Sequence, residues 1–177
     1  MSGTMLLYNL QSPINIGMML RVAEVYQRST FIRDGYGVFD REEAKRTISD
    51  FAAGALQRRP PNMLDEDQVG KLALSATNRL VVATTSPAAS DASTFRWHEH
   101  DCVILGNEYD GLPVEIESMA SVSVRIPMPS GFLPKPRSFS PIDAGRSKSV
   151  ANNGEPCLNV ATAAAVLCCF SYCALKK

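Results

Sequence analysis

The sequence predicts one α/β domain in which helices cover a mainly parallel β-sheet. Short β-branched apolar segments alternate along the chain with segments whose apolar residues recur at helical spacing. Residues 79–84 and 102–105 are apolar on both faces, as expected of strands that are covered by helices on each side. With 177 residues, of which 45% are hydrophobic, the chain is large enough for one core of ordinary size. We therefore expect a single domain over residues 1–177.

Residues 5–10 are an apolar run, and they predict a first strand that leaves into a loop at Pro13. A helix is expected from Asn15, which can cap its first turn, because apolar residues recur at helical spacing up to Tyr26. Residues 30–32 predict a second strand.

Residues 40–56 predict an amphipathic helix that is stopped by Pro60. The residues expected to face the core are Ala44, Ile48, Phe51, Ala52 and Leu56. A looser acidic connector is expected between this helix and the strand at residues 79–84.

The second half of the chain follows the same alternation. Pro113 is expected to open a short helix, since proline favours the first helical turn. Residues 121–126 alternate as a strand, and residues 158–175 predict a C-terminal helix. Between them, residues 129–156 are rich in Pro, Ser, Gly and Asn, and predict a long mobile loop.

The charge of the chain is balanced in total but uneven along its length. Lys plus Arg and Asp plus Glu both number 18, which excludes the strongly basic surface of a purely electrostatic nucleic-acid binder. The net charge is +2 over residues 1–60, −6 over 61–130 and +4 over 131–177. A polyanion is therefore expected to meet the two ends of the chain rather than its middle.

Three features point to a soluble protein of a reducing cytoplasm without a metal site. Five cysteines, three of them within residues 168–173, make a poor disulfide framework. The uncharged run at residues 157–175 is just long enough to span a bilayer, but its modest hydrophobicity favours a buried helix. His98, His100 and Cys102 would share one face of an extended segment, which allows a zinc site; a polar turn that enters a strand is the favoured interpretation.

Three separated segments carry the functional signal. The first is S-P-I-N-I-G-M-M-L-R at residues 12–21, and the second is I-L-G-N-E-Y-D-G-L at 104–112. The third is split into I-P-M at 126–128 and C-L-N-V-A at 157–161. In this order, each at a predicted strand–loop–helix junction, they resemble the signature motifs of the SpoU-type RNA ribose 2′-O-methyltransferases of the SPOUT superfamily. The resemblance extends over nearly the whole chain.

The residue types suit S-adenosylmethionine, a methyl donor that carries a sulfonium and an adenine. Gly106 and Gly111 surround the end of a predicted buried strand, where glycines let the backbone approach a flat base. The alternative interpretation is that Gly106 and Gly111 are ordinary turn glycines with no role in binding a ligand. Apolar neighbours can sandwich the adenine, namely Leu105, Ile126, Met128 and Leu158.

The resemblance implies a sheet whose C-terminal part is threaded as a deep trefoil knot, with S-adenosylmethionine as the cofactor bent inside it. It also implies a homodimer whose active site is assembled at the subunit interface. The positions that match the family's catalytic and active-site residues are Asn15, Arg21, Glu108 and Asn159. The positions that match its cofactor pocket are Ala83, Gly106, Ile126, Met128, Cys157 and Leu158.

In the family, the arginine that matches Arg21 is often assigned the activation of the ribose hydroxyl. A guanidinium stays protonated at neutral pH and is a poor general base. We expect Arg21 instead to bind the phosphate next to the target ribose and to stabilise negative charge on the 2′-oxygen. The alternative is a surface arginine on an amphipathic helix.

The chain departs from the family pattern in two places. Cys157 stands where the family usually has serine, and residues 129–156 replace a normally short loop. We expect this insertion to be a lid or an RNA-contacting arm. The two departures favour an alternative, a non-catalytic RNA- or cofactor-binding module of the same fold, which the intact Asn15, Arg21 and Glu108 oppose. A further alternative is an unrelated α/β protein with a C-terminal membrane anchor.

The expected substrate is tRNA. The first motif begins within 15 residues of the start, which leaves no room for an N-terminal RNA-binding domain. This compact form resembles the minimal family members that methylate tRNA, including those that act at the anticodon wobble ribose. RNA affinity should then fall steeply with salt.

Overall fold

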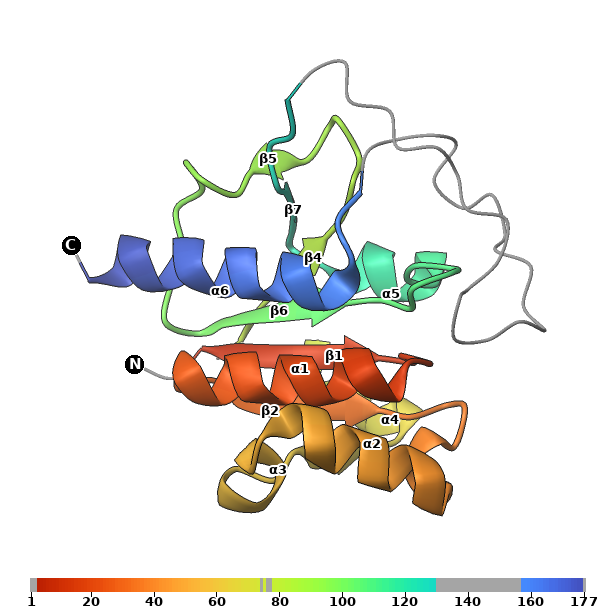
Figure 1. Cartoon of the computed structure of the whole chain (residues 1–177). Helices are drawn as coiled ribbons and strands as arrows, with labels where there is room; N and C mark the ends of the chain where they lie inside the picture. Colours follow the sequence, from red (N-terminus) through yellow and green to blue (C-terminus); the bar gives the residue numbers. More distant parts are fainter. Residues whose placement is uncertain (1–2, 74, 76–77, 130–156, 177) are drawn as a thin grey trace.

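The computed structural model describes residues 3–73, 75, 78–129 and 157–176, and Figure 1 labels their helices and strands. The strands are β1 (Thr4–Tyr8), β2 (Ser29–Arg33), β3 (Asn62–Leu64), β4 (Arg79–Ala83), β5 (Ser90–Asp91), β6 (Asp101–Leu105) and β7 (Val122–Arg125). The helices are α1 (Pro13–Val25), α2 (Glu42–Ala52), α3 (Ala55–Arg58), α4 (Glu66–Ala73), α5 (Val114–Met119) and α6 (Val160–Leu175), with a 3-10 turn η1 (Val38–Asp40).

Within the described residues the strands form one sheet of seven in the order β3-β2-β1-β6-β4-β7-β5. Every pair of neighbouring strands is parallel. All strands therefore present their carboxyl ends at the same edge of the sheet. The predicted α/β class with a mainly parallel sheet is confirmed.

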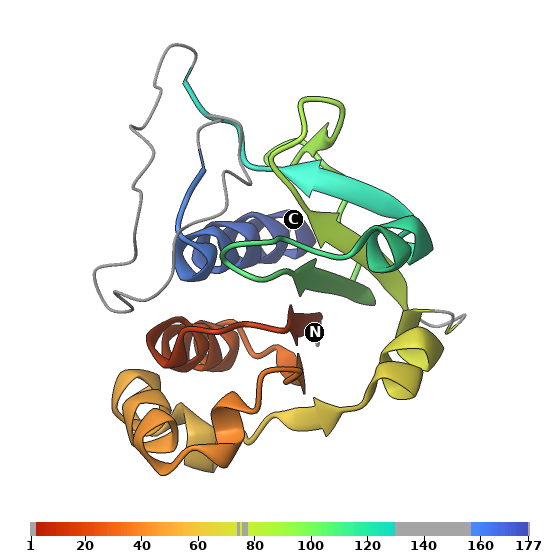
Figure 2. The ribbon, with the colours of Figure 1, turned by 90° about the vertical axis from the view of Figure 1, so that its right-hand side faces the viewer.

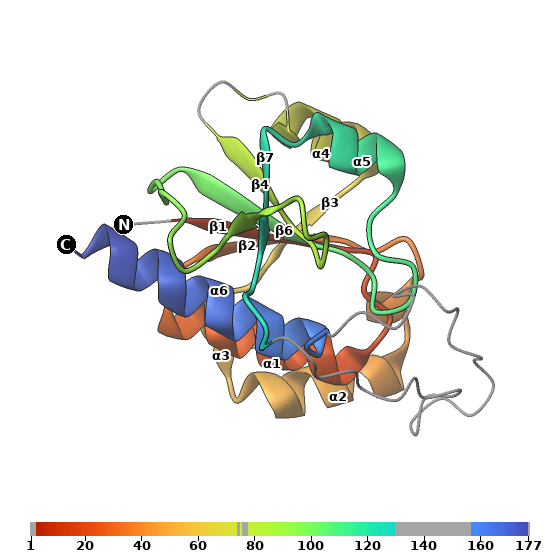
Figure 3. The ribbon, with the colours of Figure 1, turned by 90° about the horizontal axis from the view of Figure 1, so that it is seen from above.

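Side chains of the central strands alternate between two cores. Met5 and Leu7 of β1 pack on the side of α1, α2 and α6, whereas Leu6 and Tyr8 pack on the side of α4 and α5. Figures 2 and 3 show these two helical layers on opposite faces of the sheet. The central strands are thus buried on both faces, as their apolar sequences predict.

Helix α1 begins one turn earlier than its sequence predicts. Ser12 is the N-cap, and its hydroxyl accepts a hydrogen bond of 3.3 Å from the Asn15 backbone amide. The prediction that Asn15 caps this helix is wrong, because Ser12 and Pro13 start it and the Asn15 side chain is buried. Gly17 lets α2 approach closely, since a Cβ there would lie 2.6 Å from the Ile48 carbonyl oxygen.

The prediction of one continuous helix over residues 40–56 is wrong. Ala53 (φ 50°) and Gly54 (φ 85°) adopt the left-handed conformation that ends α2, and α3 begins after them. Phe51, expected to face inward, is 42% exposed because it lies at the margin of the stripe that Ile48 and Ala52 bury. The expected acidic connector contains β3 and α4, and the short β5 was also not predicted.

Helix α6 begins at Val160, after the N-cap Asn159, and lies along α1 (Figure 3). In the described part of the chain, no helix is long and apolar enough to cross a membrane. The five cysteines, all in described segments, form no disulfide. Apart from Pro129, the predicted insertion at residues 129–156 lies outside the described residues.

Candidate active site

Glu108, in the loop after β6, is bound by the loop that leads from β1 into α1. Its carboxylate accepts hydrogen bonds from the backbone amides of Gln11 (3.0 Å) and Ser12 (3.2 Å) and from Asn15 Nδ2 (2.8 Å). Hydrogen bonds to a charged acceptor are the stronger kind. The carboxyl ends of β1 and β6 are adjacent, and this explains how residues far apart in sequence meet here.

Asn159 joins the same network from the start of α6. Its Nδ2 donates to Asn15 Oδ1 at 3.0 Å, and its Oδ1 accepts from the Ala161 amide at 2.9 Å. Asn159 therefore caps α6 and at the same time orients Asn15. Asn15 is 7% exposed. Its side-chain amide is held by Glu108 on one side and by Asn159 on the other. We call Asn15, Glu108 and Asn159 the three-motif cluster.

The loop that carries Glu108 is held in shape by Asn107. The Asn107 side chain donates to the Asn9 carbonyl (2.8 Å) and accepts from the Tyr109 (2.7 Å) and Asp110 amides. Its backbone exchanges hydrogen bonds of 2.9 and 3.0 Å with Gly111. This buried asparagine uses its hydrogen-bonding groups to fix the loop, which leaves Glu108 free to face Asn15.

The two glycines of this loop have backbone reasons for being glycine. A Cβ on Gly106 would lie 2.5 Å from the Gly111 carbonyl carbon and oxygen, so the loop can close only over a hydrogen atom. Gly111 has a φ of 71°, which favours glycine. Chain packing, and not only clearance for a ligand, therefore requires these residues.

Arg21, the fourth predicted catalytic residue, lies apart from the three-motif cluster. It comes six residues after Asn15 on α1. At 3.6 residues per turn this places it about 120° away around the helix. Its side chain is exposed, and neither a hydrogen bond nor an ion pair joins it to another described residue. Within one chain the geometry unites three of the four predicted catalytic residues.

The six predicted cofactor residues follow three adjacent strands and precede α6. Gly106 follows β6, Ala83 ends β4, and Ile126 follows β7, which pairs with β4. Ala83 and Ile126 pack against the same core as Val160. Met128 is half-buried, as are Ala83, Gly106 and Ile126, whereas Cys157 and Leu158 are exposed.

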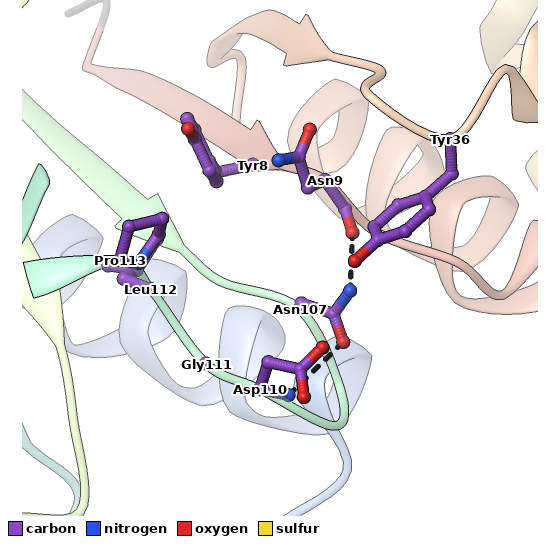
Figure 4. Close-up of a pocket in the computed structure, with 8 residues that line it drawn as sticks. All are labelled: Tyr8, Asn9, Tyr36, Asn107, Asp110, Gly111, Leu112 and Pro113. Carbon is purple, nitrogen blue, oxygen red and sulfur yellow. Dashed lines mark hydrogen bonds between the residues drawn. The ribbon is translucent and has the colours of Figure 1, made fainter.

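A pocket of about 140 Å³ lies elsewhere, where the loops after β1, β2 and β6 meet (Figure 4). In the described structure none of the six predicted cofactor residues lines this pocket. One wall is Tyr8, whose hydroxyl donates to Glu66 at 2.7 Å while Glu66 also pairs with Arg33. Burial, followed by the hydrogen bond to Glu66, raises the pKa of Tyr8 to about 12. The phenol is thus protonated at neutral pH.

The zinc interpretation of His98, His100 and Cys102 gains no support. Among the described residues no group of three His, Cys, Asp or Glu side chains could hold a metal ion. Both histidines are exposed, whereas Cys102 is buried in β6. The His98 backbone amide donates to the Asp101 carboxylate at 2.8 Å, as expected of a turn that enters a strand.

Sequence reasoning missed three residues that shape the loops around the site. Asn107, although inside the second motif, had no assigned role, and neither Asn9 nor Tyr36 was proposed for the site. One signal could have found Asn9: an asparagine at the end of a predicted strand tolerates positive φ, and Asn9 has a φ of 53°. The hydrogen bonds between distant loops have no such signature.

The SpoU rRNA Methylase family model matches residues 3–133, most of the chain, so the chain belongs to this family. The resemblance read from the motifs is thereby confirmed, as is the methyltransferase class. The comparison with curated proteins gives no match.

Solved structures share the fold. One, described as structural insights into the 2-OH methylation of C/U34 on tRNA, is 22% identical with a TM-score of 0.72, and covers 99% of this chain and 97% of its own. The AviRb SpoU methyltransferase of Streptomyces viridochromogenes, in complex with AdoMet, is 17% identical (TM-score 0.72; 98% and 58% covered). The TrmH/SpoU tRNA modifying enzyme of A. aeolicus is 15% identical (TM-score 0.71; 98% and 75% covered).

Proposed function

We propose that this protein transfers a methyl group from S-adenosylmethionine to a ribose 2′-hydroxyl of a tRNA, with the anticodon wobble nucleotide as the first position to examine. The observation that carries the proposal is the three-motif cluster, in which Glu108 and Asn159 hold Asn15 between them. Membership of the SpoU family supports RNA as the substrate. The structure concerned with C/U34 of tRNA, which this chain matches over nearly its whole length, supports tRNA.

The residues after β4, β6 and β7 fit the cofactor. Ile126 and Met128 keep part of their apolar surface exposed, and Leu158 is 36% exposed, so an adenine would find apolar surface to cover. The loop around Gly106 would offer backbone groups to its edge. When bound, S-adenosylmethionine supplies a methyl group on a positively charged sulfur. The deep trefoil knot implied by the family belongs to this proposal, because the segment that would close it lies outside the described residues.

The chain's own residues would position the ribose and stabilise its oxygen. Asn15 offers an amide whose orientation is fixed from both sides, as expected of a group that positions a substrate. Arg21 would bind the phosphate next to the target ribose and stabilise the negative charge that develops on the 2′-oxygen. Because the guanidinium stays protonated, it acts through charge and not as a base.

We further propose a homodimer in which Arg21 of the partner subunit faces the three-motif cluster. Arg21 does not join the cluster of its own chain, so a second chain is needed to bring it there. The surface around it is apolar: Met18 and Val25 on α1 are 40% and 67% exposed, and Tyr172 on the adjacent α6 is 43% exposed. An exposed apolar patch over two neighbouring helices is typical of a protein interface.

Incubation with methyl-labelled S-adenosylmethionine and total tRNA, followed by nucleoside mass spectrometry, tests the proposal. We expect the wild type to produce a 2′-O-methylated nucleotide. The Arg21→Ala variant is the matched negative control and should produce none. Binding of the cofactor without label transfer to tRNA or ribosomal RNA would favour the non-catalytic module instead. Label in ribosomal RNA alone would correct the substrate but keep the reaction. A cytoplasmic location and the single-domain organisation stay predictions.

A further inference from the structure

We propose that the pocket beside the Glu108 loop receives the base of the target nucleotide and selects a single pyrimidine. We call this cavity, whose eight lining residues are labelled in Figure 4, the base pocket. The inference rests on the proposed function, because a nucleotide must be present for its base to be read.

The base pocket lies at the topological switch point of the sheet, where the connections after two adjacent strands, β1 and β6, run in opposite directions. From β1 the chain passes through α1 to β2, and from β6 it passes through α5 to β7, on the opposite side. The loops after β1 and β6 therefore lead to opposite sides, and the pocket lies between them, beside the hydrogen bonds that join them. In open α/β sheets, ligands bind in the crevice at such a switch point, outside the carboxyl ends of the strands.

The size and charge of the base pocket decide which part of an RNA fits. Its volume is about 140 Å³. Sites for drug-sized ligands measure roughly 300–1,000 Å³, so the pocket is too small for S-adenosylmethionine and suits one small ring. Asp110 is exposed, and no ion pair joins it to any described cation. A carboxylate at the rim repels phosphate and favours the nitrogen-bound hydrogens of a base.

The walls of the base pocket suit a flat ring. Tyr36, 46% exposed, stands on one side, and Leu112 and Pro113 stand on the other (Figure 4). Single-stranded RNA bases are recognised by stacking on aromatic side chains and by hydrogen bonds to their edges. Tyr8 is buried and its hydroxyl is bound to Glu66, which keeps this wall fixed.

The polar groups of the base pocket fall into two kinds. Asn107 is occupied with loop hydrogen bonds, and Asn9 uses its Oδ1 to accept from the Gly35 amide at 2.8 Å. The Asn9 Nδ2 donor and the Asp110 carboxylate acceptor remain for a ligand. Cytosine presents an N4 donor beside its N3 acceptor, and uracil presents its N3 donor beside O4. Both pyrimidines thus match one donor and one acceptor. Purines carry the same pair on their pairing edges, so the small volume of the pocket, and not this pair, favours the single ring of a pyrimidine.

The base pocket and the three-motif cluster share one loop. Asn107, Asp110 and Gly111 line the pocket, while Glu108 between them binds Asn15. A nucleotide whose base enters the pocket therefore lies against the loop that holds Glu108. This gives a physical link between base selection and methylation.

The test compares methylation of stem–loop RNAs that are identical except at the target position, which carries cytosine, uracil, adenine or an abasic ribose. The variants are Tyr36→Ala, Tyr36→Phe and Asp110→Ala, with Asp50→Ala, an exposed change on α2, as the charge-matched control. We expect the wild type to favour the pyrimidines over the abasic RNA by roughly tenfold. Tyr36→Ala and Asp110→Ala should remove this preference, so that the pyrimidine and abasic RNAs react at similar rates, whereas Tyr36→Phe and Asp50→Ala should retain it.

If Tyr36→Ala and Asp110→Ala lowered methylation of all four RNAs equally, or lowered none of them, the base-pocket proposal would be overturned. A second measurement works even if the protein methylates none of these RNAs: titration of the labelled wild type with cytidine, uridine and adenosine, followed by nuclear magnetic resonance. We expect the pyrimidines to shift the signals of the Asn9 side chain and the Gly111 amide, and Tyr36→Ala to abolish the shifts. Shifts confined to other regions, or equal shifts with adenosine, would contradict the proposal. Absence of methylation together with these shifts would reject the proposed reaction and retain the pocket.

Discussion

The three-motif cluster and the predicted cofactor residues lie at the same edge of the sheet but differ in how they are held. In the cluster, Glu108, Asn15 and Asn159 are fixed by hydrogen bonds that join loops from three parts of the chain. Among the cofactor residues, Cys157 and Leu158 are exposed. The polar groups that would position the ribose are thus organised by the fold itself. The apolar groups that would contact the cofactor have surface left for a ligand.

Because of this difference, some changes should act on folding and others on function alone. A change in the cluster removes contacts that also connect β1, β6 and α6, so stability and activity should fall together. A change at Arg21 or at Cys157 touches exposed surface, so it should leave the fold intact. Four experiments test this contrast.

Arg21→Ala should have the largest effect, a loss of roughly 10²–10³-fold in kcat, because it would remove the proposed charge stabilisation of the reacting oxygen. Its side chain is exposed, so the free energy of unfolding should stay within about 0.5 kcal/mol of the wild type. Cofactor affinity, measured by calorimetry, should be unchanged. Unchanged methylation by Arg21→Ala would refute the assignment.

Glu108→Gln should lower both activity and stability. The amide cannot accept the hydrogen bonds from Gln11, Ser12 and Asn15 as a carboxylate does, which should cost about 2 kcal/mol in urea unfolding. Activity should fall by roughly 10²-fold, because Asn15 loses its fixed orientation. Glu99→Gln, an exposed change of the same kind, is the control and should behave like the wild type. A stable but inactive Glu108→Gln would separate the two roles that we join.

A pair of glycine changes separates loop packing from helix propensity. Gly106→Ala places its Cβ against the Gly111 backbone, so we expect a loss of about 1–3 kcal/mol in unfolding free energy and a displaced loop. Gly70→Ala, in α4, meets nothing within 4 Å and should stabilise by up to about 1 kcal/mol. Thermal unfolding of both variants measures the difference. Equal shifts in the same direction would contradict the close approach of Gly106 and Gly111.

The smallest of the four expected effects is a change in the alkylation rate of Cys157, one of the exposed cofactor residues. Cys157 is exposed and should react with iodoacetamide, and S-adenosylmethionine should slow that reaction severalfold. Burial raises the pKa of Cys102 to about 12 and that of Cys168 to about 11. Both thiols should therefore stay protonated and unlabelled between pH 7 and 9, with or without cofactor, and serve as internal controls in peptide mass spectrometry. A rate at Cys157 that the cofactor does not change would argue against its place in the cofactor site.

Sequence patterns predicted the parallel sheet well because its central strands are apolar on both faces, a pattern that few other folds require. They failed where tertiary contacts decide. Asn15 looked like a helix cap, but Ser12 caps the helix and Glu108, distant in sequence, binds Asn15. The break after α2 depends on positive φ at Ala53, which helix propensity does not predict.

The candidate site was predictable as a set of residues but not as a geometry. The motifs identified Asn15, Glu108 and Asn159, which do meet, and Arg21, which lies apart in its own chain. Gly17 was part of the first motif, yet its close contact with the Ile48 carbonyl is visible only once α1 and α2 are packed. Spacing along a chain carries no information about such contacts between elements.

Complementation between two inactive variants tests the composite active site most directly. Arg21→Ala and Glu108→Gln chains with different tags are co-expressed, and the mixed dimer is purified through both tags and assayed with tRNA. If Arg21 serves the cluster of the opposite subunit, the mixed dimer holds one intact site and should recover about half the activity of the wild-type dimer. Each variant alone should remain inactive. A mixed dimer as inactive as its parents would contradict the account, because it would place Arg21 and Glu108 in the same subunit's site.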